Sequence, residues 1–487
     1  MLPYQNLLNI NRTAATPIFL QLTNELVKLI QNGQLSAGAK LPSSRNFAQL
    51  LGLNRNTVTK AIEELEALGW VEILPKKGTF LVNTFPIVQP NDWSNQKGFS
   101  KKLPENSFEF YDFPTLKKPK AYTKNLGFDD GLPDVRLAPI DELARGYARN
   151  LRQLAFEQEL SYKDGLGNFD LRKQLAKMLN ETRGLNINLD NILITKGTVM
   201  AIHLAVAASV KAGDRVLVGA TNYKTSDMII RHFGGELVRL PVDDQGIQVD
   251  KIPAICEKQP IRAIYVTSHH HHPTTVTLSP ERRMRLLKMA NKYNFVILED
   301  DYDYDYHFDN SPVLPLASGD KDGRVLYFGS FTKMIAPAFR VGYLVGPKRI
   351  IQALPKLRRI MDRQGDIILE KTIADLLEDG TIRRHLKKSW RHYKERRDFC
   401  CDLLKKEFGN LIHFQPPAGG MAIWVKFDKS ISIPKLSKKM LESGFYMSDG
   451  SNYNPAGVQL NSIRMGFASM NLAEIERCVK LLKSLVG

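Results

Sequence analysis

Hydrophobic residues in the first part of the chain recur at the spacing of short helices. Leu22 and Leu26 share one face of a predicted helix, because residues four apart meet on a helix surface. A shorter predicted helix follows, with Phe47 on its inner face. Ser43 or Ser44 can cap the start of that helix through a side-chain oxygen. The pattern therefore predicts two consecutive helices.

A further short helix is predicted after a tight turn. Gly52 suits the left-handed conformation that ends a helix, and Asn54 can cap the next one. Val58, Ile62 and Leu65 then face inward at helical spacing. Two helices so close together have the spacing of a helix-turn-helix, which places its second helix in the major groove of DNA.

Two short apolar runs after these helices read as strands, VEIL at residues 71–74 and TFLV at residues 79–82. The turn between them carries two lysines, and a basic tip of this kind would meet phosphates or the minor groove. Outward residues in the first turns of the second helix can reach base edges. The residues that we expect to contact DNA are Ser44, Arg45, Arg55, Asn56, Thr57, Lys60, Lys76, Lys77 and Gly78.

This order of elements resembles the winged helix-turn-helix of the GntR family over about residues 16–82. The string that carries the resemblance is LPSSR…NTV…LEALGW…GTF. The resemblance implies a double-stranded DNA operator as a partner. The alternative is a helical protein-interaction domain.

The remainder of the chain alternates short apolar runs with longer helical patterns, as an α/β domain does. Between the two patterns lies a segment rich in Pro, Lys and Asn, whose prolines oppose a continuous helix. We therefore expect a DNA-binding domain at residues 14–84, a linker at 85–124 and an α/β domain at 125–487.

Composition excludes several classes of protein. The 487 residues contain 68 Lys+Arg against 51 Asp+Glu, a net charge of +17, which favours a polyanionic partner. The four cysteines show neither a CxxC pair nor zinc spacing, which indicates a reducing compartment. The start of the chain does not read as a signal peptide, and no apolar run approaches the ~20 residues of a membrane helix. We therefore expect a cytoplasmic bacterial protein, associated with the nucleoid when bound to DNA.

Three apolar runs in the α/β domain end in polar residues, and open α/β sheets bind ligands beyond the carboxyl ends of their strands. The first run, NILIT, leads into Lys196, Gly197 and Thr198, whose amides at a helix start could hold a phosphate. The second run, FVIL, leads to Asp300 and Tyr302. A carboxylate there can pair with a protonated pyridine nitrogen, and a tyrosine can bond a ring hydroxyl. The alternative is an acidic metal site.

The third run, VLYF, leads into a lysine flanked by hydroxyl groups. Lys333 can form a Schiff base if its surroundings lower its pKa. Ser330 and Thr332 offer hydroxyls to a phosphate, and Arg340 offers a guanidinium fork.

Together the three runs resemble fold-type I aminotransferases, which use pyridoxal 5'-phosphate. With the N-terminal domain they resemble the MocR/GabR subfamily of GntR-type regulators, over nearly the whole chain outside residues 85–124. The strings that carry the resemblance are GLPDVRLAP (131–139), YKDGLGNFDLR (162–172), SPERR (279–283), EDDYD (299–303), SFTK (330–333) and SIRMGFA (462–468).

The resemblance assigns a role to each matching residue. Lys333 matches the lysine of the internal aldimine, Asp300 the partner of the pyridine nitrogen, and Tyr302 the partner of the ring oxygen. Ser330 and Arg340 match phosphate ligands. The remaining matches are Tyr223, which stacks on the ring, Tyr162, which reaches the neighbouring subunit's phosphate and implies a homodimer, and Arg464, which grips the α-carboxylate of an amino acid.

The chain departs from the family pattern at two places. The pattern T-P-S-H-Q-aromatic-P-T-G stands here as TSHHHHPTT at residues 267–275, with His270 at the matching cofactor-lining position. Neighbouring histidines on an extended segment point apart, which disfavours a metal site. The γ-aminobutyrate-responsive member has an arginine where this chain has Thr225, so the resemblance does not support that effector.

These observations predict a pyridoxal-phosphate-dependent transcription regulator that senses an amine, an amino acid or vitamin B6 itself. An active aminotransferase with an attached DNA-binding domain is the alternative. A vestigial site without cofactor is disfavoured by the intact set of cofactor residues. The basic run at residues 383–397 is either a further DNA contact or a solvated helix face.

Overall fold

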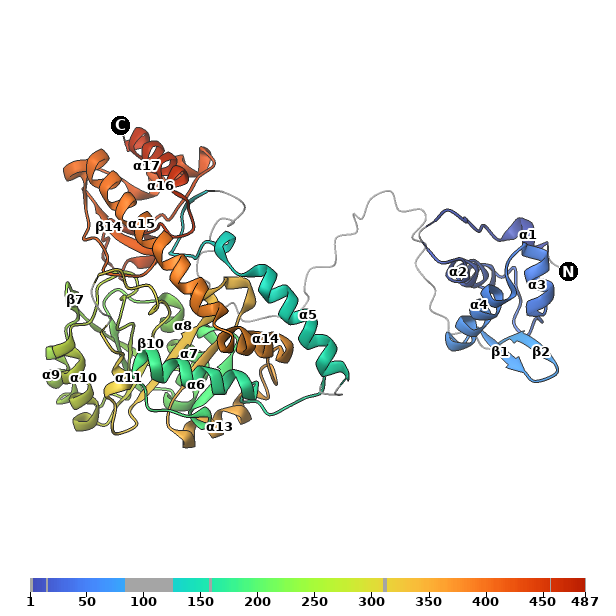
Figure 1. Ribbon diagram of the computed structural model, residues 1–487, viewed down its shortest axis with the longest axis horizontal. Coiled ribbons are helices and arrows are strands. Elements are labelled where there is room, and N and C mark those ends of the chain that lie inside the picture. Colours follow the sequence, from blue (N-terminus) through green and yellow to red (C-terminus); the bar gives the residue numbers. More distant parts are fainter. Residues whose placement is uncertain are drawn as a thin grey trace. The chain divides into compact units, whose positions relative to one another are not determined.

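The computed structural model describes residues 3–14, 16–83, 126–156, 160–309, 313–455 and 457–486. The chain divides into two compact units, Met1–Tyr111 and Asp112–Gly487 (Figure 1). The segment predicted as a linker, 85–124, lies outside the described residues.

The smaller unit is a helix-turn-helix followed by a two-stranded hairpin. Its core is formed by apolar side chains such as Leu26, Phe47 and Leu65, which are at most 1% exposed. Its elements are α1 (Tyr4–Leu7), α2 (Ile18–Gln31), α3 (Ser44–Leu51), α4 (Arg55–Ala67), β1 (Val71–Leu74) and β2 (Gly78–Leu81). The strands pair antiparallel, with Val71 opposite Leu81.

The helix ends of this unit confirm the predicted caps. The Ser43 side chain accepts a hydrogen bond from the backbone of Asn46 at the start of α3. Gly52 ends α3 with φ +63°, a conformation that costs glycine little. The Asn54 side chain accepts from the backbone of Asn56 at the start of α4. These caps fix the short turn between α3 and α4.

The larger unit is built on a seven-stranded sheet. Its strand order is β4-β12-β11-β10-β9-β5-β6, and β12 alone runs antiparallel to its neighbours. The strands are β4 (Ile192–Thr195), β5 (Arg215–Gly219), β6 (Glu236–Leu240), β9 (Ala263–Val266), β10 (Val296–Asp300), β11 (Val325–Ser330) and β12 (Gly342–Val345). The central strands are buried on both faces, which explains their continuous apolar runs.

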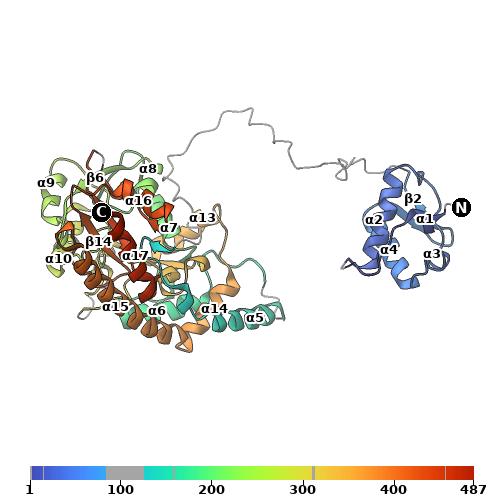
Figure 2. The ribbon, with the colours of Figure 1, turned by 90° about the horizontal axis from the view of Figure 1, so that it is seen from above.

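Helices pack on both faces of the sheet, and further helices cover the C-terminal part (Figure 2). The helices are α5 (Ile140–Phe156), α6 (Phe169–Arg183), α7 (Thr198–Ser209), α8 (Lys224–His232), α9 (Ile252–Cys256), α10 (Pro280–Tyr293), α11 (Leu316–Gly319), α12 (Phe331–Met334), α13 (Lys348–Arg358), α14 (Ile367–Glu378), α15 (Thr381–Phe408), α16 (Ile433–Glu442) and α17 (Leu472–Val486). Leu298 packs with α7 on one face of the sheet, whereas Ile297 packs with α6 and α10 on the other.

A separate core holds the C-terminal part of this unit together. It packs α15, α16 and α17 with a three-stranded sheet in the order β13-β14-β16. The remaining strands are β3 (Gly127–Phe128), β7 (Val242–Asp243), β8 (Gly246–Ile247), β13 (Ile412–His413), β14 (Ala422–Phe427), β15 (Tyr446–Met447) and β16 (Ser462–Gly466). Strand β3 pairs parallel with β15, so the segment around residue 128 joins this C-terminal core.

Candidate functional site

The predicted site residues of the sheet meet at one of its edges. Asp300 ends β10, Ser330 ends β11 and Thr198 follows β4, and these strands are parallel to one another. Arg340 precedes β12, whose antiparallel direction brings its start to the same edge. The convergence follows from strand direction, as in other α/β sheets.

A cavity of about 230 Å³ opens at this edge. The predicted residues that line it are Thr198, Tyr223, Asp300, Tyr302, Ser330, Thr332, Lys333 and Arg340. The lining residues that the sequence did not single out are Asp130, Leu132, Val199, Tyr265, Thr267 and His272.

Lys333 projects into this cavity from the short helix α12. The Ser330 side chain caps that helix by accepting a hydrogen bond of 2.9 Å from the backbone of Thr332. The ammonium of Lys333 donates to the backbone oxygen of Gly131. Burial lowers the pKa of Lys333, so its neutral amine is more accessible than that of a solvated lysine. A lysine in this state is suited to react with a carbonyl group.

Asp300 presents an unsatisfied carboxylate oxygen in the cavity wall. The Tyr265 hydroxyl donates a hydrogen bond of 2.7 Å to Oδ2 of Asp300. Oδ1 is buried and has no hydrogen-bond partner among the described residues. Burial raises the pKa of Asp300 to about 7. A protonated pyridine nitrogen would satisfy Oδ1 and favour the ionised carboxylate, so this residue fits pyridoxal phosphate.

A second corner of the cavity is suited to a phosphate. Gly197, with φ +78°, precedes the 12-residue helix α7, and a Cβ there would lie 2.9 Å from Nη2 of Arg340. The guanidinium therefore packs directly on the Gly197 backbone and donates 3.0 Å to the Lys196 carbonyl. Thr198 at the helix start and the hydroxyls of Ser330 and Thr332 complete the corner.

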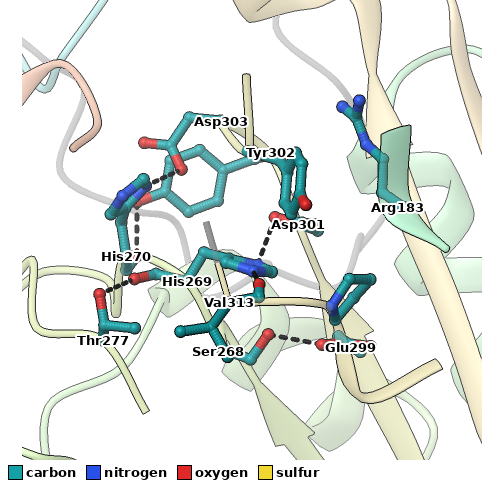
Figure 3. Close-up of polar contacts among 12 residues, drawn as sticks. Arg183, Ser268, His269, His270, Thr277, Glu299, Asp301, Tyr302, Asp303 and Val313 are labelled. Atoms are coloured by element: carbon teal, nitrogen blue, oxygen red, sulfur yellow. Dashed lines mark hydrogen bonds and ion pairs between the residues drawn. The ribbon is translucent and has the colours of Figure 1, made fainter. Parts of the chain in front are cut away.

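The histidine segment differs from its prediction. His270 does not line the cavity, because its ring is buried against Asp303, with Nδ1 2.7 Å from Oδ1 (Figure 3). His270 contacts the cavity lining through Tyr302, whose hydroxyl donates a hydrogen bond of 2.8 Å to the His270 carbonyl. His272 lines the cavity instead, with its ring 5.2 Å from that of Tyr223. His270 and His272 would point to the same side on a regular strand. Residues 267–273 form no strand, so the two side chains point in different directions.

The neighbouring acidic and histidine residues form a layer behind the cavity. His269 Nδ1 lies 3.0 Å from Asp301 Oδ1 (Figure 3). The Tyr327 hydroxyl donates a hydrogen bond of 2.7 Å to the same carboxylate. The Ser268 hydroxyl donates to Glu299. Among the described residues no group of three or more His, Cys, Asp or Glu side chains is arranged to hold a metal ion. This layer serves to hold β10 and the histidine segment together.

Arg464 on β16 lies beside the cavity but is itself 1% exposed. Its three nitrogens donate to the Asp130 carbonyl at 3.3 Å, the Pro273 carbonyl at 3.3 Å and the Tyr302 hydroxyl at 3.2 Å. Its Nε is also 3.6 Å from the Asp130 carboxylate. Each nitrogen of the guanidinium predicted to grip an incoming carboxylate thus already donates one hydrogen bond to the protein.

Tyr162 lies away from the cavity lining. Its side chain is exposed, and the guanidinium carbon of Arg363 lies 3.8 Å from the centre of its ring. A single chain leaves its predicted contact with a neighbouring subunit untested.

The smaller unit presents its predicted DNA residues to solvent. Arg55, Asn56 and Lys60 are exposed on α4, whereas Ser44 and Thr57 are half-buried at helix starts. Arg45 is exposed on α3, Lys76 and Lys77 lie in the hairpin turn, and the half-buried Gly78 begins β2. None of these arginines and lysines forms an ion pair with another described residue, which leaves their charges available to phosphates.

The polar residues at the site that sequence patterns missed are Asp130, Tyr265, Thr267, His272 and Tyr453. The Tyr453 hydroxyl donates 2.8 Å to Asp130, although 323 positions separate the two. No local pattern reports such a contact. For His272, the family pattern offered a signal, because an aromatic residue stands at that position.

Two family models match the chain. "Aminotransferase class I and II" matches residues 127–482, and "Bacterial regulatory proteins, gntR family" matches residues 20–81. No helix in the described part of the chain is both long and apolar enough to cross a membrane.

Curated relatives share both parts. The HTH-type transcriptional regulator YisV of Bacillus subtilis is 28% identical over 96% of each chain. The probable rhizopine catabolism regulatory protein MocR of Rhizobium meliloti is 25% identical, also over 96% of each. The α-aminoadipate aminotransferase LysN of Thermus thermophilus, solved with N-(5'-phosphopyridoxyl)-L-leucine, is 25% identical with a TM-score of 0.69, over 74% of this chain and 92% of LysN.

The fold, the cavity chemistry and these similarities agree. The unsatisfied oxygen of Asp300, the lowered pKa of the half-buried Lys333 and the anion-binding corner fit pyridoxal phosphate, which is the cofactor that the aminotransferase fold indicates. The chain belongs to the aminotransferase class I and II family and joins this fold to a gntR-type winged helix, as regulators of the MocR/GabR subfamily do.

Proposed function

We propose that this chain regulates transcription by sensing an amine effector through pyridoxal phosphate bound to Lys333. The observation that carries the proposal is the meeting of Lys333, Asp300 and Arg340 in one cavity of a chain that also has a winged helix. Effector binding shifts DNA affinity only if the effector binds the two states of the protein unequally.

Each cavity residue has a distinct proposed task. When bound, pyridoxal phosphate supplies an aldehyde that reacts with amines and a ring that accepts electrons. Lys333 holds the cofactor, Asp300 keeps a proton on its ring nitrogen, and Tyr302 orients its ring oxygen. Residues at the anion-binding corner hold the phosphate, and the Tyr223 ring stacks on the cofactor. The corner residues are Gly197, Thr198, Ser330, Thr332 and Arg340.

On the DNA side, α4 is the proposed major-groove helix. Its exposed Arg55 can bond guanine with two hydrogen bonds, which specifies sequence. Lys76 and Lys77 in the hairpin turn neutralise phosphates and contribute affinity without sequence preference. The proposed working form is a cytoplasmic homodimer, because Tyr162 matches a residue that serves the neighbouring site.

The proposal is tested by two measurements on the purified full chain loaded with pyridoxal phosphate. Visible absorption is recorded during titration with a panel of amines and amino acids, and DNA affinity is measured with and without any compound that changes the spectrum. A stable spectral shift that accompanies a change in DNA affinity is expected. A compound that shifts the spectrum while DNA affinity stays constant for the whole panel would overturn the sensing proposal.

Aminotransferase activity is the second candidate, because the half-buried, low-pKa lysine needed for proton transfer is present. It predicts progressive accumulation of pyridoxamine phosphate with release of a keto acid. The sensing hypothesis instead predicts a shift in the visible absorption spectrum that stays constant over time.

A further inference from the structure

Asp130 places a negative charge on the effector side of the cavity. Its side chain is 38% exposed and lines the same cavity as Lys333. The ammonium of Lys333 donates to the next carbonyl along the chain, that of Gly131. The Asp130 carboxylate and the Lys333 amine thus line one cavity.

Three neighbours hold this carboxylate in place. The Tyr453 hydroxyl donates 2.8 Å to Oδ1, and His272 Nε2 lies 3.1 Å from Oδ2. Arg464 Nε lies 3.6 Å from Oδ1. His272 and Arg464 lower the pKa of Asp130 and outweigh the opposing effect of its partial desolvation, so the carboxylate is ionised at neutral pH.

The hydrogen-bond donors of the site each have a protein partner. Each nitrogen of Arg464 donates one hydrogen bond to a protein oxygen, and the side chain is buried. His272 is paired with Asp130, and Arg340 lies in the anion-binding corner proposed for the cofactor phosphate. An α-carboxylate that binds Arg464 would have to displace the Asp130 carboxylate. Asp130 would also repel it, since like charges a few ångströms apart oppose binding.

We propose that Asp130 selects amines without an α-carboxylate, and best a diamine whose second ammonium pairs with the Asp130 carboxylate. A diamine offers one neutral amine to the cofactor on Lys333 and one cation to Asp130, so both ends are matched. This inference rests on the proposed amine sensing and names its ligand class.

The first test uses the unaltered full chain loaded with pyridoxal phosphate. Visible absorption is followed during titration with 1,4-diaminobutane, n-butylamine, L-alanine and L-glutamate. The half-saturating concentration of 1,4-diaminobutane is expected to be at least ~10-fold lower than that of either amino acid. This ratio corresponds to a favourable pairing of about 1.4 kcal/mol. The half-saturating concentration of n-butylamine should lie between that of the diamine and those of the amino acids. An amino acid that saturates at the lowest concentration would overturn the role of Asp130 and leave amine sensing intact. A spectrum that no compound changes would overturn both.

Variants of Asp130 then test whether its negative charge causes the preference for diamines. Asp130→Asn is expected to raise the half-saturating concentration of 1,4-diaminobutane at least ~10-fold and to lower that of L-alanine, because Arg464 loses its internal carboxylate. Asp130→Glu keeps the charge and should keep the diamine preference. Asp141→Asn makes the same chemical change at an exposed position of α5 and serves as the matched control. An Asp130→Asn protein that binds cofactor and keeps the wild-type ranking would contradict the inference.

Discussion

The hydroxyl of Tyr265 binds one oxygen of the Asp300 carboxylate at 2.7 Å and leaves the other oxygen buried without a partner among the described residues. The tyrosine on β9 thereby orients the carboxylate on the neighbouring strand β10. The other oxygen, Oδ1, therefore still needs a hydrogen-bond donor.

Asp300→Asn should stabilise the cofactor-free protein at high pH. Burial raises the pKa of Asp300 to about 7, whereas an unfolded aspartate titrates near ~3.9. The stability contributed by its proton is fully present below about pH 4 and is lost as the pH rises through 7. The variant lacks this loss, so its advantage in unfolding free energy should grow between pH 5 and pH 8 by on the order of 1–3 kcal/mol. Urea unfolding at both values measures it.

The same variant should bind pyridoxal phosphate more weakly, because an amide cannot balance a protonated ring nitrogen. If the cofactor-free variant exceeded the unaltered protein in unfolding free energy by the same amount at pH 5 and pH 8, Asp300 would not titrate in this range.

Lys333→Ala should abolish the visible absorption of covalently held cofactor and the response of DNA binding to amines. Basal DNA affinity should remain within about twofold, because the winged helix lies in a different unit. Absorption spectra and DNA titrations measure the two properties. Lys211→Ala, an exposed lysine of the same unit, is the matched control. A retained amine response in the Lys333 variant would refute covalent sensing.

Arg55→Ala should weaken specific DNA binding by about 1–3 kcal/mol and leave non-specific binding nearly unchanged, if Arg55 contacts a base. Replacing both Lys76 and Lys77 by Ala should weaken both kinds of binding. The double variant should also reduce the slope of log affinity against log salt by about 2. Lys28→Ala is the control, since Lys28 pairs with Glu25 on α2. Equal losses for Arg55→Ala on both kinds of DNA would assign Arg55 to phosphate.

Arg396→Ala should destabilise the larger unit by about 1.5–3 kcal/mol, the range for a lost hydrogen bond to a charged group. Arg396 is 8% exposed in its side chain and lies 2.9 Å from the buried Asp134, which keeps Arg136 as its other ionic partner. Thermal unfolding in the absence of cofactor measures the change. Arg391→Ala, at an exposed position of the same helix α15, should change stability by less than about 0.5 kcal/mol. Similar effects of the two substitutions would contradict an internal role for Arg396.

The basic run at residues 383–397 shows why sequence patterns read charge poorly. Lys387, Lys388 and Arg391 are exposed, whereas Arg396 and Arg397 are buried and paired with Asp134 and Asp309. Part of the run therefore stabilises the fold, and only the exposed part is available to a partner. Charge counting cannot separate these groups, because Asp134 and Asp309 are distant from the run in sequence.

Local features of the fold were readable from the sequence. The caps at Ser43 and Asn54 and the left-handed Gly52 were predicted correctly, because caps depend on residues two to four positions apart. The strand ends at Asp300 and Ser330 were also readable, since apolar runs mark buried strands. The network of Asp130 with Tyr453 and Arg464 was not, because it joins segments more than 300 residues apart.

The walls of the cavity belong to two different hydrophobic cores. Asp300 and Lys333 are anchored by the seven-stranded sheet, whereas Tyr453 and the strand that carries Arg464 pack in the C-terminal core. Substitutions that repack the second core can move Tyr453 and Arg464 and leave Asp300 and Lys333 where they are. Under the proposed function, such substitutions would change which amine is recognised without altering the residues that hold the cofactor.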